Sequence, residues 1–108
     1  MSAAERLDET VLDALGNPMR RRIIRILKAG PRPVGSIAAE LPVSRPAVSK
    51  HLRLLERAEL VKHERTGTKN VFRLNRTGFD AARAWLDDFW DEALERFARI
   101  AEEGDESR

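Results

Sequence analysis

The 108-residue sequence contains no cysteine, so disulfide bonds, thiolate metal sites and a cysteine nucleophile are excluded. It has only two histidines, and neither belongs to a recognisable catalytic constellation. His51 has no acidic residue near it on its predicted helix before Glu56, and His63 lies beside Glu64 but on the other face of a predicted strand. No serine or glycine-rich loop completes either arrangement. We therefore predict that the chain is not an enzyme.

Long apolar runs are also missing. Nowhere do about 18 apolar residues follow one another, and residues 1–16 carry acids instead of the basic start and apolar stretch of a signal peptide. We therefore expect a cytoplasmic protein without a membrane segment. A length of 108 residues, 42% hydrophobic and 35% charged, fits one soluble domain spanning 1–108. Because a domain of this size leaves much apolar surface uncovered, its terminal helices are expected to form a dimer.

The net charge of +2 hides a strongly uneven distribution. Residues 1–19 carry a net charge of −3, residues 20–76 carry +11, and residues 77–108 carry −6. A long basic segment between acidic ends is typical of a nucleic-acid-binding surface on a scaffold that does not touch the polymer. Solvated helix faces are the alternative for any one helix, but they explain a 57-residue segment poorly.

Four helices are predicted in the first half of the chain, because apolar residues recur at helical spacing between capping residues and breakers. The first helix ends at Gly16, and Asn17 caps the second. Pro42 terminates a short third helix, and Ser44 caps a fourth that continues to Ala58. A connection of about three residues between the third and fourth helices predicts a helix-turn-helix.

The fourth helix has one basic side and one apolar side. Val48 and Leu52 lie opposite a face that carries no acid before Glu56 and that fits a major groove about 12 Å wide. An ordinary amphipathic surface helix is the alternative. The residues expected to contact DNA are Ser44, Arg45, Pro46, Ala47, Ser49, Lys50, His51 and Arg53, with Arg45, Ser49, Lys50 and Arg53 reading bases. His51 lies at the edge of this face, where we expect a local or phosphate hydrogen bond instead of a metal.

Alternating apolar residues over 60–65 and 69–75 predict a β-hairpin around Thr66-Gly67-Thr68. A basic hairpin of this kind is suited to a phosphate backbone or minor groove, although a purely stabilising ribbon is the alternative. The expected wing contacts are Lys62, Arg65, Thr66, Gly67, Thr68, Lys69 and Asn70, and Arg20 and Arg21 are expected to contact phosphates. The fold predicted is mainly α with a β-hairpin, a winged helix-turn-helix with five helices in the order four helices, hairpin, helix.

Thr77, with Asp80 three residues later, predicts a capping box at the start of a last helix of about six turns, with residues 102–108 frayed. Four of the six aromatic residues lie within thirteen residues of this helix, where they form either a dimer core or an effector pocket. The predicted dimer interface comprises Val11, Leu12, Leu15, Trp85, Phe89, Trp90, Leu94 and Phe97.

The sequence resembles the ArsR (ArsR/SmtB-type) family of winged-helix repressors over residues 9–78. The resemblance rests on LDALGNPMRRRIIRIL, SRPAVSKHLRLLERAELV and RTGTKNVFRL. It implies a homodimer joined through its first and last helices that binds an inverted-repeat operator and blocks transcription. Ala58, where glycine is common, and Phe72, where tyrosine is common, are mild departures.

Metal sensing is not implied, because the chain has no cysteine and residues 77–108 contain no histidine, whereas the family's familiar sensors use one or the other. The acids of the last helix are expected to be a solvated face. Double-stranded DNA and a second copy of the chain are the expected partners, with no cofactor, no metal, no membrane and no effector indicated. The alternative is a winged-helix module for protein interaction or nonspecific DNA binding.

Overall fold

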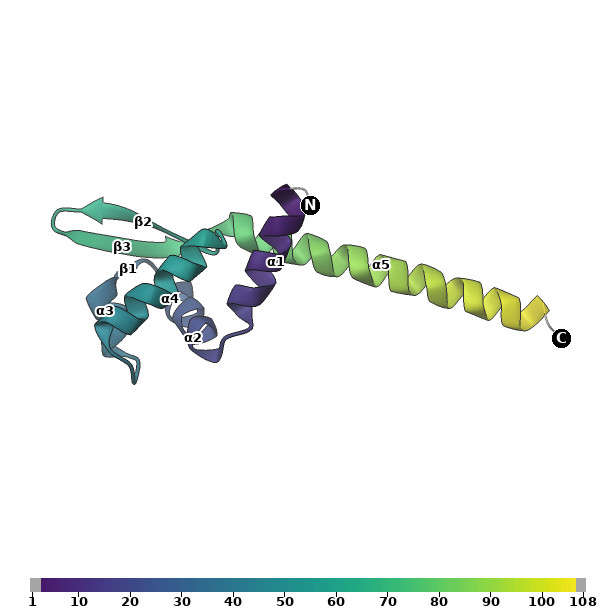
Figure 1. Cartoon of the computed structure of the whole chain (residues 1–108), viewed down its shortest axis with the longest axis horizontal. Helices are drawn as coiled ribbons and strands as arrows, with labels where there is room; N and C mark the ends of the chain where they lie inside the picture. The colour runs from purple at the N-terminus through teal and green to yellow at the C-terminus, as the bar shows by residue number, and fades with distance from the viewer. Residues whose placement is uncertain (1–2, 107–108) are drawn as a thin grey trace.

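The computed structural model describes residues 3–106, which form five helices and three strands (Figure 1). The helices are α1 (Ala3–Leu15), α2 (Pro18–Lys28), α3 (Val34–Ala39), α4 (Arg45–Arg57) and α5 (Arg76–Glu106). The strands are β1 (Arg32–Pro33), β2 (Val61–Thr66) and β3 (Lys69–Leu74). This is the predicted winged helix-turn-helix, with one strand more than the sequence indicated.

Two of the predicted helix caps are confirmed. The Asn17 side-chain oxygen accepts a hydrogen bond from the Arg20 backbone N–H at 3.1 Å, and Ser44 Oγ accepts one from the Ala47 N–H at 3.3 Å. A proline lies in the first turn of both helices, where its missing N–H leaves no hydrogen bond unmade. The starts of α2 and α4 are therefore determined by residues close to them in the sequence.

One apolar core holds α1 to α4 and the base of the sheet together. Ile23, Ile37, Leu52 and Leu60 are among its fully buried side chains. Val11 is also fully buried, with 0% of its surface exposed inside its own protomer. The dimer contact predicted for Val11 is therefore wrong, because no part of that side chain remains to meet a partner.

The sheet is antiparallel and has the strand order β1-β3-β2. β2 and β3 form the predicted hairpin, in which His63 lies opposite Phe72. The third strand, β1, was not predicted from the sequence, and its Pro33 lies opposite Val71. Two residues are too few to show an alternating pattern, so this strand exists only because the chain before α3 meets the outer edge of β3.

The turn from α4 to β2 ends the helix with a left-handed residue. Glu59 has φ 55°, and the Leu60 N–H donates to the Leu55 carbonyl at 3.0 Å, as in a Schellman motif. Ala58, by contrast, has φ −82° and is fully buried. The position that favours glycine is therefore residue 59, and the departure noted at Ala58 has no conformational consequence.

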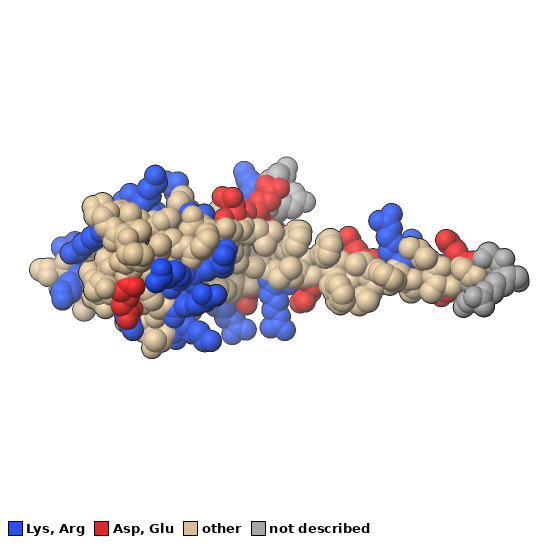
Figure 2. Space-filling view, turned by 90° about the horizontal axis from the view of Figure 1, so that it is seen from below, with Lys and Arg blue, Asp and Glu red and all other residues tan. Residues whose placement is uncertain are grey.

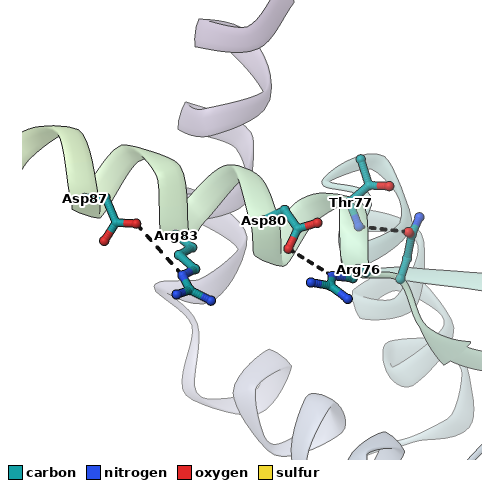
Figure 3. Close-up of polar contacts among 6 residues, drawn as sticks. Arg76, Thr77, Asp80, Arg83 and Asp87 are labelled. Atoms are coloured by element: carbon teal, nitrogen blue, oxygen red, sulfur yellow. Dashed lines mark hydrogen bonds and ion pairs between the residues drawn. The ribbon is translucent and has the colours of Figure 1, made fainter.

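α5 begins at Arg76, two residues earlier than a helix capped by Thr77 would, and it has a different cap. Asn75 Oδ1 accepts the Thr77 backbone N–H at 3.1 Å, so the capping box predicted for Thr77 and Asp80 is wrong (Figure 3). Asp80 pairs instead with Arg76 at 3.3 Å. Asn75 takes the capping position because its own N–H is held at the end of the sheet by the Leu60 carbonyl, at 2.8 Å.

The first turn of α5 packs directly on the α4–β2 turn. The Gly78 N–H donates to the Glu59 carbonyl at 2.7 Å, and a Cβ on Gly78 would lie only 2.5 Å from the Ala58 carbonyl oxygen. From this contact α5 runs away from the body of the molecule (Figure 1). Body and helix together are 71 Å long. The helix continues to Glu106, so residues 102–106 are helical where a frayed tail was predicted, while residues 107–108 lie outside the described part.

Candidate nucleic-acid interface

The basic residues gather on the body of the molecule. On the face seen in Figure 2, groups of Lys and Arg side chains lie at several places on the body with a few acids among them, whereas α5 carries a mixture in which acids are spread along the helix. Within the residues that the structure describes, no helix is both long and apolar enough to span a membrane. Basic and acidic residues are thus distributed unevenly in space as well as along the sequence.

α4 separates its basic and apolar sides as predicted. Val48, Leu52 and Leu55 are fully buried in the core, whereas Arg45, Lys50 and Arg53 are exposed. Ser44 and Pro46 are also exposed, and Ala47, Ser49 and His51 are half-buried. The helix therefore presents to solvent a face on which three positive charges are spread from its first residue to beyond its middle.

Glu56, the acid near the C-terminal end of α4, is turned towards the sheet. Its Oε2 lies 2.5 Å from His63 Nδ1 on β2, and the His63 ring lies against the Phe72 ring with centroids 5.0 Å apart. This contact removes a negative charge from the exposed face of α4. It also ties the recognition helix to the wing, a connection that the separation of seven residues in the sequence did not indicate.

The wing is fully open to solvent, since every residue from Lys62 to Asn70 is exposed. Thr66 pairs with Lys69, so the turn consists of Gly67 and Thr68 alone. Gly67 has φ 63°, the left-handed conformation that a two-residue hairpin turn requires at its first position. The predicted wing residues therefore lie together on an exposed ribbon.

Arg20 and Arg21, for which a phosphate contact was predicted, donate hydrogen bonds to backbone carbonyls at the end of α1. Arg20 Nε donates to the Ala14 carbonyl at 2.8 Å, and Arg21 Nη1 donates to the Leu15 carbonyl at 2.7 Å. Both guanidinium groups thus satisfy carbonyls at the end of α1, where positive charge is favoured. Their contact with phosphate stays a prediction.

His51 is held in an environment that disfavours its charged form. Burial lowers the pKa of His51 below its usual 6.5, and the charges of Arg20 and Lys50 lower it further. Its Nδ1 is buried without a hydrogen-bond partner among the described residues, so the local hydrogen bond predicted as one of its two roles is not made at this atom. The phosphate contact of His51 stays a prediction.

The long helix leaves an apolar face uncovered. Trp85 and Phe89 stack with ring centroids 5.6 Å apart, and the exposed fraction of the large apolar side chains ranges from 39% at Trp85 to 74% at Phe97. Leu86 and Ile100 belong to the same face, although the predicted interface omitted them. Leu12 and Leu15 on α1 are half-buried. The part of the chain that the structure describes therefore does not cover this face.

Among the described residues, no three or more His, Cys, Asp or Glu side chains lie together as metal ligands would. The acids of α5 include Asp80 and Asp87, which pair with arginines four residues before them (Figure 3).

A helix-turn-helix with a one-sided basic second helix, next to an exposed basic β-wing, defines the class of winged-helix DNA-binding transcription regulators. Comparison with known proteins agrees with this class, since the profile of a helix-turn-helix domain family matches residues 15–64.

The chain is 46% identical over 95 residues to the HTH-type transcriptional regulator Rv2034 of Mycobacterium tuberculosis, covering 87% of this chain and 89% of that protein. It is 34% identical to the transcriptional repressor SdpR of Bacillus subtilis, covering 73% and 88%. The solved homodimeric winged helix-turn-helix domain of Mb0332 from Mycobacterium bovis, a possible ArsR-family regulator, superposes with a TM-score of 0.65 at 30% identity, covering 89% and 93%. The chain belongs to the ArsR-type family of winged helix-turn-helix transcriptional regulators.

Proposed function

We propose that this regulator is a homodimeric repressor that binds an inverted-repeat operator. Each α4 lies in the major groove of one half-site, and each wing contacts the adjacent backbone or minor groove. The observation that carries this proposal is the separation on α4 of three exposed cationic side chains, Arg45, Lys50 and Arg53, from a fully buried apolar side. Arginine and lysine on the exposed face of a helix match the acceptors of guanine in the major groove.

The uncovered face of α5 supports the dimer. Single exposed apolar residues are normal on a protein surface, but a continuous series that includes Trp90, 61% exposed, and Phe97, 74% exposed, indicates an interface. The solved Mb0332 domain is homodimeric, and SdpR is named a repressor. A two-fold dimer presents its recognition helices symmetrically, so its site is an inverted repeat with half-sites about 34–36 Å apart or a multiple of this distance.

Selection of duplexes from a random pool tests sequence-specific binding. We expect the enriched sequences to share an inverted repeat, and the affinity for them to fall steeply as salt rises. Equal affinity for selected and unselected duplexes would leave only a nonspecific DNA-binding module. No measurable affinity for either would favour the protein-interaction module instead.

The composition of the chain, with no cysteine and with no histidine in residues 77–108, argues against a signal that is a metal held by cysteine or histidine. We propose that the repressor acts on DNA in the cytoplasm, and that an effector, if the cell supplies one, binds along the aromatic face of α5. Addition of Zn²⁺ is expected to leave operator affinity unchanged in a titration, whereas a metal-dependent loss of binding would contradict this.

A further inference from the structure

A cavity of about 370 Å³ lies where the wing, α3 and α4 meet. The pairing of β1 with β3 creates it, because Pro33 lies opposite Val71 and the chain then continues into α3 alongside the outer part of the wing. Six of its lining residues are Pro33, Gly35, Ser36, Arg45, Lys69 and Asn70. Three segments that are separate in the sequence therefore share one hollow on the basic side of the molecule.

The side chain of Arg45 reaches across this hollow. Its Nη1 lies 3.7 Å from the point that a Cβ on Gly35 would occupy, so the guanidinium lies over the start of α3. Lys69, the first residue of β3, also lines the cavity. None of the residues that line the cavity is acidic, and neither Arg45 nor Lys69 forms an ion pair within the described residues. The cavity therefore has two positive charges without a counter-charge.

We propose that this cavity seats one phosphodiester group of the DNA backbone, held by Arg45 and Lys69, with Ser36 and Asn70 as neutral hydrogen-bond donors. Guanidinium and ammonium groups bind phosphate oxygens strongly, and contacts of this kind fix register without reading sequence. This assigns Arg45 to phosphate binding, in place of the base reading that its position on the polar face of α4 predicted. It also means that the wing and the recognition helix hold the same phosphate.

The inference rests on the proposed DNA binding, so its test begins from a duplex that the wild-type protein has selected. Methylphosphonate groups, which are neutral, replace the phosphates of that duplex one at a time, and the affinity is measured by fluorescence anisotropy. We expect one linkage in each half-site to weaken binding by wild type by about tenfold or more. Arg45→Ala should weaken binding to the unmodified duplex by a similar factor and reduce the sensitivity to that linkage, because only Lys69 then contributes a positive charge there.

Arg57→Ala is the matched control, because Arg57 is an exposed arginine on the same helix that does not line the cavity. Whatever its effect on affinity, it should keep the full sensitivity at the linkage where Arg45→Ala reduces it. Arg45→Ala should also weaken binding to selected and random duplexes by the same factor and make the salt dependence shallower by about one unit. A loss confined to the selected sequence would show that Arg45 reads a base and would overturn the proposal.

Gly35→Asp provides a second variant, and we expect it to fold as the wild type does. Residue 35 lies in the first turn of α3, where an acid is favoured, and a Cβ there makes only ordinary contact with Arg45. The new carboxylate would halve the positive charge of the cavity and pair with Arg45 in place of the phosphate, so we expect DNA affinity to fall about tenfold or more with an unchanged circular dichroism spectrum. Unchanged affinity in Gly35→Asp would overturn the proposal.

Free inorganic phosphate, added at constant ionic strength, should compete with DNA no better than chloride does. Competition by phosphate alone would mean that the cavity serves a small anion, and the proposal would then fail. Absence of DNA binding by the wild-type protein is a different outcome, because it would remove the proposed function itself before any variant is compared.

Discussion

Gly78 occupies the joint between α5 and the rest of the fold, and no larger residue fits there. A Cβ would lie 2.5 Å from the Ala58 carbonyl oxygen and 2.6 Å from that of Glu59, and both are backbone atoms that cannot rotate away. We therefore expect Gly78→Ala to lower the free energy of unfolding by about 1–3 kcal/mol, the usual cost of overpacking. Urea denaturation at a fixed protein concentration measures this difference.

Gly104 supplies the matched control, because among the described residues nothing outside the adjoining part of its own helix lies within 4 Å of the position that its Cβ would take. It also lies within α5, where glycine is a poor helix former. Gly104→Ala should therefore raise the free energy of unfolding by up to about 1 kcal/mol, provided that unfolding includes this end of the helix. A loss of stability in both variants would contradict the steric account of Gly78.

Glu59 is a non-glycine residue in the left-handed conformation, at φ 55°. Its side chain is exposed, and it forms no ion pair within the described residues. Glu59→Gly should relieve strain of about 1–2 kcal/mol, against about 0.5–1 kcal/mol of added chain entropy in the unfolded state. We expect a small rise in the melting temperature by calorimetry, and a fall would show that the side chain makes a stabilising contribution of its own.

His51 makes stability depend on pH. Because burial and the charges of Arg20 and Lys50 lower its pKa in the folded state below the usual 6.5, the unfolded chain binds the proton more readily. The free energy of unfolding should therefore decrease as pH falls through about 6.5 and stop decreasing below the folded-state pKa. Urea denaturation between pH 7.5 and 5.5 should show a smaller decrease in His51→Gln than in wild type. Parallel pH profiles for the two proteins would rule out His51 as a source of the effect.

At the scale of the elements, α4 is the helix that we propose to recognise the DNA sequence. Arg53 lies near the middle of its exposed face and does not line the cavity assigned to phosphate. Arg53→Ala should weaken binding to a selected operator by about 1–3 kcal/mol and relax the preference at one base pair, as measured by mobility shift on single-base variants. Lys62→Ala on the wing is the comparison, since a phosphate contact should weaken all duplexes alike. Unchanged operator affinity in Arg53→Ala would mean that α4 does not enter the groove as proposed.

The elements differ in how well local sequence predicts them. α2 and α4 begin where Asn17 and Ser44 indicate, because an N-cap is a contact between neighbours in the chain. The prediction that Thr77 caps α5 is wrong, since the choice of Asn75 depends on a hydrogen bond to Leu60, the residue just before β2. β1 is a clearer case, because its two residues become a strand only by pairing with β3.

At the scale of the whole molecule, the aromatic face of α5 should hold the dimer. Trp85→Ala combined with Phe89→Ala removes a stacked pair from that face. We expect light scattering to show the mass of a monomer at concentrations where wild type is a dimer, with the circular dichroism of the body retained. Arg25→Ala, which changes an exposed residue of α2, should remain a dimer. A double variant of unchanged mass would favour a ligand-binding role for these rings.

The order of helices, the one-sided charge of α4 and the turn at Gly67 follow from the sequence alone, because periodicity, capping and hairpin turns involve residues close together in the chain. The tertiary structure decided which side chains remain available. It buries Val11 in the core, uses Arg20 and Arg21 at the end of α1, and brings Arg45 beside Lys69. Contacts between distant segments determine these positions, and such contacts leave no periodic signal in the sequence.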